Sequence, residues 1–247
     1  MNDMFERTRL LIGCEGLNKI KQATVLVIGV GGVGSICVES LARSGVGKII
    51  VVDGDTIDIT NLNRQLQTTE NNIGKSKAHE MVKHIKSISN NIDIEYYDIF
   101  FDKDHFEIFE KVDFVVDAID TLSSKLDLIE ICLEKKIPFI SSMGMGNRLD
   151  PSLVHQTTLD KTEYDPLAKV LRKMARDKKI DLKKINVIFS NERPITQNKV
   201  LNKDGETRKE RIPPASMFLV PPAAGLLAAS ICIRYLIQAD KKASNKS

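Results

Sequence analysis

The stretch Val25–Gly34, VLVIGVGGVG, is an apolar run that ends in four glycines. Such a pattern is typical of a buried strand that turns tightly into a helix. Glycines at this turn let a phosphate approach the backbone N–H groups at the helix N-terminus. We therefore expect Gly29, Gly31, Gly32 and Gly34 to form a phosphate-binding turn. The turn alone does not distinguish NAD from ATP.

Strands and helices alternate around this turn. Apolar periodicity predicts strands at residues 24–28, 48–52, 93–97, 113–116 and 138–142, and helices at 17–23, 33–43, 75–89 and 122–135. This alternation predicts the fold class α/β: a Rossmann-like, mostly parallel sheet with helices on both faces.

The pattern changes after about residue 144. It predicts an extended segment, a helix at 165–179, a strand at 186–190 and a turn at 204–205, so a C-terminal α/β portion extends the sheet. We expect one domain over residues 1–247, with an ATP-binding part at 1–145 and a substrate and dimer part at 146–247.

Composition indicates an ordinary soluble protein with a formal net charge of +3. The four cysteines form no CxxC pair, so we expect reduced thiols, no zinc and a cytoplasmic location. Residues 215–237 are apolar, but Pro221 and Pro222 interrupt them. A loop followed by a buried helix fits this stretch better than a membrane span.

Polar residues after the second strand indicate which nucleotide binds. The segment DGDTIDITNLNRQ, residues 53–65, begins with an aspartate placed to accept hydrogen bonds from ribose. Its amides and Arg64 can donate to phosphates, and Lys77 adds a second cation. Asp117 and Asp120, in DAID, are placed to ligate Mg²⁺. The expected nucleotide-binding residues beyond the glycines are Asp53, Asp55, Asn61, Asn63, Arg64, Gln65, Lys77, Asp117, Asp120 and Thr121.

These segments also carry a family resemblance. The motifs similar to the ubiquitin-activating-enzyme-like superfamily are RLLIG, VLVIGVGGVGS, DGDTIDITNLNRQ, GKSKAHEM and DAIDT, within roughly residues 7–145. Members of this superfamily adenylate a carboxylate with MgATP. The resemblance implies that Gly32, Asp53, Asn61, Asn63, Arg64, Lys77 and Asp120 bind ATP. It also implies a homodimer in which Arg9 reaches the ATP of the partner subunit, and catalytic roles for Arg9, Arg64, Lys77 and Asp120, with Asp120 near Mg²⁺.

The second half narrows the substrate. DPLAKVLRK, VIFSNERP and SMFLVPPAAGLLAA resemble the branch of this superfamily that uses ATP to dehydrate threonylcarbamoyladenosine at position 37 of tRNA. Some members of the branch have a cysteine where this chain reads IPPASMF, so a mechanism that requires that thiol is not expected. Adenylation of a sulfur-carrier protein and NAD binding remain the alternative functions. The sequence leaves open whether a monovalent cation or a sulfur-transfer or carrier partner is required.

A tRNA substrate predicts a basic surface. Between Lys161 and Lys184 there are nine Lys or Arg residues and four Asp or Glu residues. A solvated helix face would have a similar composition, but this excess can also follow a phosphate backbone. The expected tRNA contacts are Lys169, Arg172, Lys173 and Arg176.

Overall fold

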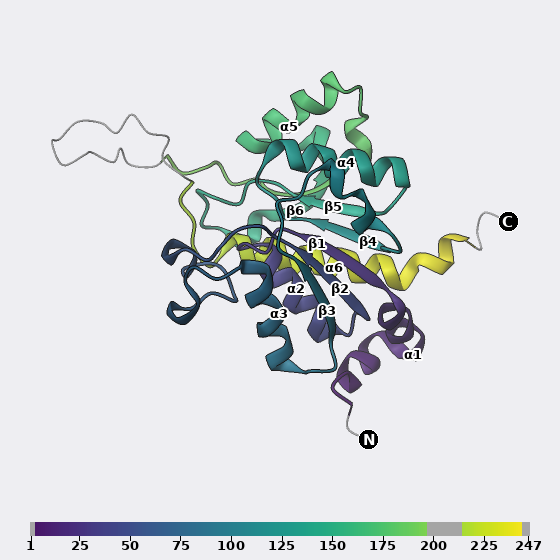
Figure 1. Cartoon of the computed structure of the whole chain (residues 1–247). Coiled ribbons are helices and arrows are strands. Elements are labelled where there is room, and N and C mark those ends of the chain that lie inside the picture. Colours follow the sequence, from purple (N-terminus) through teal and green to yellow (C-terminus); the bar gives the residue numbers. More distant parts are fainter. Residues whose placement is uncertain (1–2, 197–213, 244–247) are drawn as a thin grey trace.

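A computed structural model of the chain describes residues 3–196 and 214–243. Within these ranges the strands form a seven-stranded sheet with the order β3-β2-β1-β4-β5-β7-β6 (Figure 1). The strands are β1 Thr24–Ile28, β2 Lys48–Val52, β3 Asp93–Tyr97, β4 Phe114–Asp117, β5 Phe139–Ser142, β6 Val154–Thr158 and β7 Asn186–Ser190. All neighbouring strands run parallel except β6, which is antiparallel to β7. The predicted α/β class with a mostly parallel sheet is confirmed.

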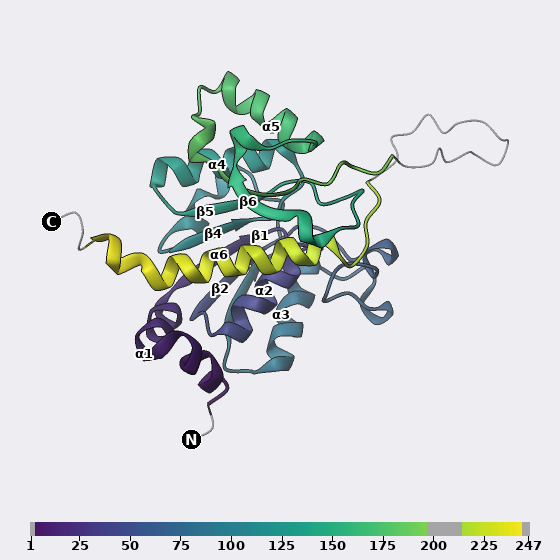
Figure 2. The same cartoon turned by 180° about the vertical axis from the view of Figure 1, so that it is seen from behind.

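Helices cover both faces of this sheet (Figures 1 and 2). The helices are α1 Glu6–Gln22, α2 Gly34–Ser44, α3 Lys77–Ile88, α4 Leu122–Lys135, α5 Pro166–Asp177 and α6 Val220–Ala243. Alternate strand residues face opposite sides, so Val25 and Val27 pack with α1, α2, α3 and α6, whereas Leu26 and Ile28 pack with α4 and α5. The core therefore consists of two apolar layers separated by the sheet.

Several element boundaries differ from the prediction. The first helix begins at Glu6 instead of residue 17, and Gly13 interrupts its helical dihedral angles. The last helix begins at Val220, so Pro221 and Pro222 lie within its first turn. Proline is tolerated there because the first N–H groups of a helix have no intrahelical acceptor. The predicted turn at 204–205 lies outside the described residues.

Helix α6 is the one described helix long and apolar enough to cross a membrane, by length and composition, over Val220–Gln238. It lies across one face of the sheet in Figure 2 and packs against α2. The fit is close, since a Cβ on Gly225 would lie 2.3 Å from the Val33 carbonyl oxygen. More than half of the apolar stretch is buried within the fold. This arrangement is that of a core helix, as the sequence predicts.

The C-terminal portion continues the same sheet. Strand β7 pairs with β5, and β6 pairs with β7, so the elements after residue 145 extend the surface built by the first half. Because β1 to β5 and β7 are parallel, their carboxyl ends lie along one edge. The loops that follow these strands gather there, which is where ligands bind in open α/β sheets.

Candidate functional site

The glycine turn lies between the carboxyl end of β1 and the start of α2. Gly34 permits close packing, because a Cβ on it would lie 1.8 Å from the carbonyl oxygen of Gly29. Gly31 faces more open space, and a Cβ there would meet only the Gln65 amide nitrogen, at 3.9 Å. The turn thus combines Gly34, which must be small for close packing, with Gly31, which leaves backbone open to a ligand.

Asp53 follows β2 and closes one side of the turn. Its Oδ2 accepts a hydrogen bond from Val30 N at 2.7 Å, and its Oδ1 accepts one from Asp55 N at 2.9 Å. Burial raises the pKa of Asp53, while these two hydrogen bonds oppose the shift. The carboxylate is held against the glycine turn, where it can accept from ribose hydroxyl groups.

A turn after the short helix Ile59–Asn61 brings the predicted amides and Arg64 to the same place. Asn61 Oδ1 accepts from Asp58 N at 3.0 Å, so its amide nitrogen is the group available to donate. Arg64 Nη1 donates to Asn63 Oδ1 at 3.0 Å. The Arg64 carbonyl oxygen would lie 3.3 Å from a Cβ on Gly32, so this segment faces the glycine turn directly.

Gln65 provides an independent indication that a ligand binds here. The residue is buried, and its Oε1 has no hydrogen-bond partner among the described residues. A buried carbonyl oxygen without a donor is unfavourable, so such atoms in native proteins usually require an explanation. The amide nitrogen of Gln65 lies beside Gly31, so this polar side chain borders the turn where a nucleotide would bind. The residues present therefore fit ATP.

Lys77 is the first residue of α3 and points toward the loop after β2. Its Nζ lies 2.7 Å from Asp55 Oδ2, and 9% of the lysine side chain is exposed against 54% of the aspartate side chain. The ammonium group is thus mostly shielded from water and has one carboxylate at its open side. This environment strengthens its attraction for a nearby phosphate.

The three predicted residues at the end of β4 and in the loop after it lie in different environments. Asp117 is fully buried, with its Oδ2 2.8 Å from Lys125 Nζ, so its carboxylate is directed into the core and not toward a metal ion in the nucleotide site. Asp120 and Thr121 are exposed in the loop, and Thr121 precedes α4. In the described ranges no group of three or more His, Cys, Asp or Glu residues is placed to hold a metal. Of the two carboxylates expected near Mg²⁺, only Asp120 faces solvent at this edge.

Lys125 is a residue that sequence reasoning missed. Its Nζ also donates to Ser142 O at 3.0 Å and Ser141 Oγ at 3.3 Å, and its side chain is fully buried. The available signal was its position on the apolar face of α4, beside Leu126 and Ile129. A lysine at a core position usually has a buried acidic partner.

Arg9 lies far from the glycine turn, at the opposite edge of the sheet. It forms an ion pair with Asp3 at 2.6 Å, and Asp3 also lies 3.7 Å from Lys21 near the end of α1. Because α1 ends just before β1 begins, this group lies at the amino edge of the sheet (Figure 1). Within one protomer, Arg9 is not brought together with Arg64.

The four predicted tRNA-binding cations lie on α5. Lys169, Lys173 and Arg176 are exposed on the outer face of the helix, opposite its buried residues. Arg172 is half-buried and donates to Thr162 O at 2.8 Å. Three of the four side chains are thus free of the core and face solvent, whereas Arg172 also anchors the preceding segment.

A hollow of about 380 Å³ borders the nucleotide loop at the carboxyl edge. Its lining comes from residues 147–149, 195–196 and 215–217. Asn63 Nδ2 donates to Ser216 O at 2.8 Å, which joins the hollow to the predicted ATP site. Arg148, another residue missed from sequence, lies in its wall and is almost fully buried.

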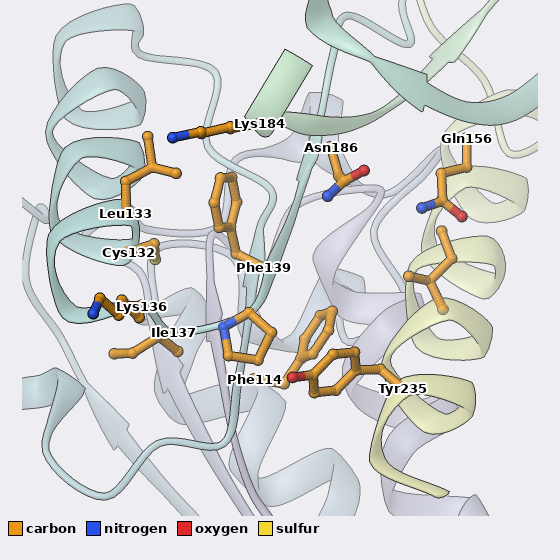
Figure 3. Close-up of a pocket in the computed structure, with 12 residues that line it drawn as sticks. Phe114, Cys132, Leu133, Lys136, Ile137, Phe139, Gln156, Lys184, Asn186 and Tyr235 are labelled. Atoms are coloured by element: carbon orange, nitrogen blue, oxygen red, sulfur yellow. The ribbon is translucent and has the colours of Figure 1, made fainter. Parts of the chain in front are cut away.

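A larger hollow of about 540 Å³ lies elsewhere. Figure 3 shows Phe114, Phe139 and Asn186 around it, and these are the first residues of β4, β5 and β7. It therefore opens at the amino edge, opposite the glycine turn. Burial strongly raises the pKa of Cys132 in its lining, so that thiol is a poor nucleophile. Size alone does not make this hollow the functional site.

Comparisons with known proteins identify relatives that are similar over nearly the whole chain. The chain is 40% identical over 245 residues to the tRNA threonylcarbamoyladenosine dehydratase of Bacillus subtilis, which covers 96% of each chain. Two solved structures of the E. coli enzyme of that name, TcdA, are 30% identical to this chain and cover 97% of it and 96% of their own chains. Their TM-scores are 0.87 for the complex with AMP and 0.86 for the complex with ATP.

Residues 5–247 match the ThiF family. The match spans the glycine turn, the segment from Asp53 to Gln65 and the C-terminal strands. The chain belongs to the ThiF family.

Proposed function

We propose that this protein is an ATP-dependent dehydratase that closes the threonylcarbamoyl group of adenosine 37 in tRNA into a ring. The proposal rests on one observation: a nucleotide cradle and a hollow lie next to each other at the carboxyl edge of the sheet. The glycine turn, Asp53 and the orphaned Gln65 Oε1 form a nucleotide cradle, and a hollow next to it can receive a second substrate. Relatives with this name, one of them solved with ATP and with AMP, support the assignment.

The first step is adenylation. The threonine carboxylate of the substrate attacks the α-phosphate of ATP, and pyrophosphate leaves. Arg64 and Lys77 offset the negative charge that develops on the phosphates. Asp120 would hold Mg²⁺ together with the phosphate oxygens, and the ion would supply further charge neutralisation.

The second step needs no cysteine nucleophile. The carbamoyl group attacks the activated carbonyl within the same substituent and releases AMP, so the net change is loss of one water. Intramolecular attack has a high effective concentration, which means that the protein mainly has to orient the group. Burial raises the pKa of Cys37, Cys132 and Cys232, which fits the absence of a thiol from this mechanism.

The functional unit is a homodimer in this proposal. Arg9 lies at the amino edge, so it can contribute to catalysis only at the site of a second subunit. Mixing Arg9→Ala with Arg64→Ala tests this, since random exchange gives dimers with one intact site and restores about a quarter of wild-type activity. Recovery of no activity after confirmed subunit exchange refutes the role of Arg9 in the partner's site.

The cation-rich face of α5 is the proposed tRNA contact. Lys169, Lys173 and Arg176 face solvent and can contact phosphates, with Arg172 beside them. Such contacts predict binding that weakens steeply with salt. A tRNA-modifying reaction that uses ATP also fits a cytoplasmic enzyme with reduced thiols and no zinc.

The decisive test incubates the protein with MgATP and tRNA carrying threonylcarbamoyladenosine. Mass spectrometry of the digested nucleosides is expected to show a product lighter by one water, with AMP formed in equal amount. Arg64→Ala and Asp120→Ala are expected to abolish AMP formation while circular dichroism shows an unchanged fold. Turnover retained in both variants contradicts the site assignment.

The carrier-protein alternative gives a different result in the same assay. It predicts pyrophosphate exchange that depends on a protein ending in Gly-Gly and no change in the modified tRNA. That outcome overturns the dehydratase proposal and leaves the adenylation site in place. Repeating the tRNA assay with potassium, with sodium and with neither ion decides whether a monovalent cation is required.

A further inference from the structure

We propose that Tyr164 and Arg193 form a stacking platform for a nucleobase that neighbours the reacting adenosine, and so position the tRNA over the hollow beside the ATP site. The inference rests on the proposed function and adds a residue-level tRNA contact to it. Neither residue belongs to the nucleotide cradle or to the basic face of α5.

The two side chains form an exposed pair. The Arg193 guanidinium carbon lies 4.7 Å from the centroid of the Tyr164 ring, and Arg193 Nη2 donates to Tyr164 Oη at 3.3 Å. Tyr164 is 48% exposed, and Arg193 is also exposed. An aromatic ring with an arginine stacked on it is a surface on which nucleobases stack, since every base has a π-face.

The backbone of Tyr164 is held in an unusual conformation. Its φ of +50° lies in the left-handed region, which bulky residues rarely adopt. Arg148 Nη2 donates to the Tyr164 carbonyl oxygen at 3.3 Å, and the neighbouring Asp165 Oδ2 accepts from Gly144 N at 3.0 Å. Strain of this kind persists only where surrounding contacts enforce it, and it is often found at functional sites. Here the enforced conformation keeps a large ring at the surface.

The platform lies at the functional edge of the sheet. Gly144 follows β5 and Arg193 follows β7, so both residues lie at the carboxyl edge of the sheet. Arg148 lines the 380 Å³ hollow and also binds the Tyr164 backbone. Ser216 also lines the hollow, and its carbonyl oxygen accepts a hydrogen bond from Asn63 of the nucleotide loop. The hollow is thus connected to the ATP site through one set of residues and to the platform through another.

The surrounding charges favour nucleic acid as the occupant. Helix α5 begins directly after Asp165 and presents Lys169 and Lys173 to solvent. A base-stacking surface beside cations that can hold phosphates is the combination by which proteins bind unpaired nucleotides. A hollow next to this surface can accept the modified adenosine while its neighbour remains stacked outside.

The test compares two substitutions of Tyr164 in the full chain. Tyr164→Asn removes the ring but tolerates positive φ, so the fold is expected to be retained. Its KM for modified tRNA is expected to rise about 10-fold, within the range that loss of one stacked base produces, with KM for ATP unchanged. Tyr164→Phe keeps the ring and is expected to stay within about 2-fold of wild type.

A matched control pair exists at the opposite edge. Lys135 lies 5.6 Å from the centroid of the exposed Phe106 ring, and Lys135 ends α4 just before β5 begins. Phe106→Ala removes another exposed aromatic residue from a similar pair and is expected to leave KM for tRNA unchanged. A tRNA with 2-aminopurine next to position 37 gives a direct readout, because stacking on Tyr164 quenches its fluorescence and Tyr164→Asn is expected to abolish that quenching.

The outcomes distinguish a failure of the stacking platform from a failure of the proposed function. A wild-type protein that leaves the modified nucleoside unchanged refutes the proposed function. An active wild type whose KM and quenching are the same in Tyr164→Asn refutes the platform alone. A Tyr164→Asn variant that instead changes the subunit stoichiometry in sedimentation identifies the pair as a protein–protein contact and also overturns the platform.

Discussion

Replacing Lys125 by methionine is expected to reduce the free energy of unfolding by about 3 kcal/mol. Its ammonium group has three protons, and the structure provides three acceptors: Asp117 Oδ2 at 2.8 Å, Ser142 O at 3.0 Å and Ser141 Oγ at 3.3 Å. Asp117 and Lys125 both have 0% side-chain exposure. Methionine fills a similar volume, so the substitution mainly leaves a buried carboxylate without its cation.

The magnitude follows from what remains around that carboxylate. Breaking a buried ion pair by removing one partner costs about 3–5 kcal/mol. Asp117 Oδ1 still accepts from Ile119 N at 3.0 Å, and Ser141 still donates to Oδ2. These two hydrogen bonds keep part of the charge solvated, which places the expected cost at the lower end of the range.

Urea unfolding followed by circular dichroism measures this cost. The double variant Asp117→Asn/Lys125→Met removes both charges and is expected to be more stable than Lys125→Met alone, because an amide is less costly to bury than an unpaired carboxylate. A loss below about 1 kcal/mol in Lys125→Met, or a double variant that is less stable than both single variants, refutes the buried-pair reasoning.

Three further predictions concern the rest of the fold and the site. Gly34→Ala is expected to destabilise the protein strongly, because its Cβ would lie 1.8 Å from the Gly29 carbonyl oxygen. Normal thermal stability of this variant contradicts the prediction. Gly32→Ala is expected to fold and to weaken ATP binding, which calorimetry measures. Among the cysteines, only Cys14 is exposed, so a thiol reagent at pH 8 is expected to label one site per native chain, and Cys14→Ser to remove it. Because burial raises the pKa of Asp53 above its ordinary value of 3.8, the folded state binds this proton more tightly than the unfolded state. The free energy of unfolding of the wild type, relative to that of Asp53→Asn, is therefore expected to fall as the pH rises from about 3.8 through the raised pKa. An increase in this difference over the same pH range contradicts the prediction.

The parallel strands and their carboxyl edge could be predicted because buried strands appear as short apolar runs. The runs at Thr24–Ile28 and Lys48–Val52 were bounded correctly for this reason. The glycine turn could be placed with them, because its backbone demands are local. These features are determined by residues close together in sequence, so the sequence pattern predicts them.

Side-chain direction and distant contacts could not be predicted in this way. Asp117 ends a strand as expected, but its partner Lys125 is known only once α4 is packed on the sheet. Arg148 follows a strand in a loop without periodicity, so nothing local indicates its burial. The approach of Arg193 to Tyr164 depends on how the segments after β6 and β7 fold back to the same edge.

The contact between Pro221 and the glycine turn has a consequence for how the site forms. The Pro221 Cβ would lie 3.1 Å from a Cβ on Gly32, so the first turn of α6 forms part of the wall beside the phosphate loop. Almost the whole polypeptide must therefore leave the ribosome before this wall exists, although every nucleotide-binding motif is synthesised much earlier. A fragment ending at residue 145 would contain those motifs and still lack a complete pocket, so nucleotide affinity reports the folding of the full chain.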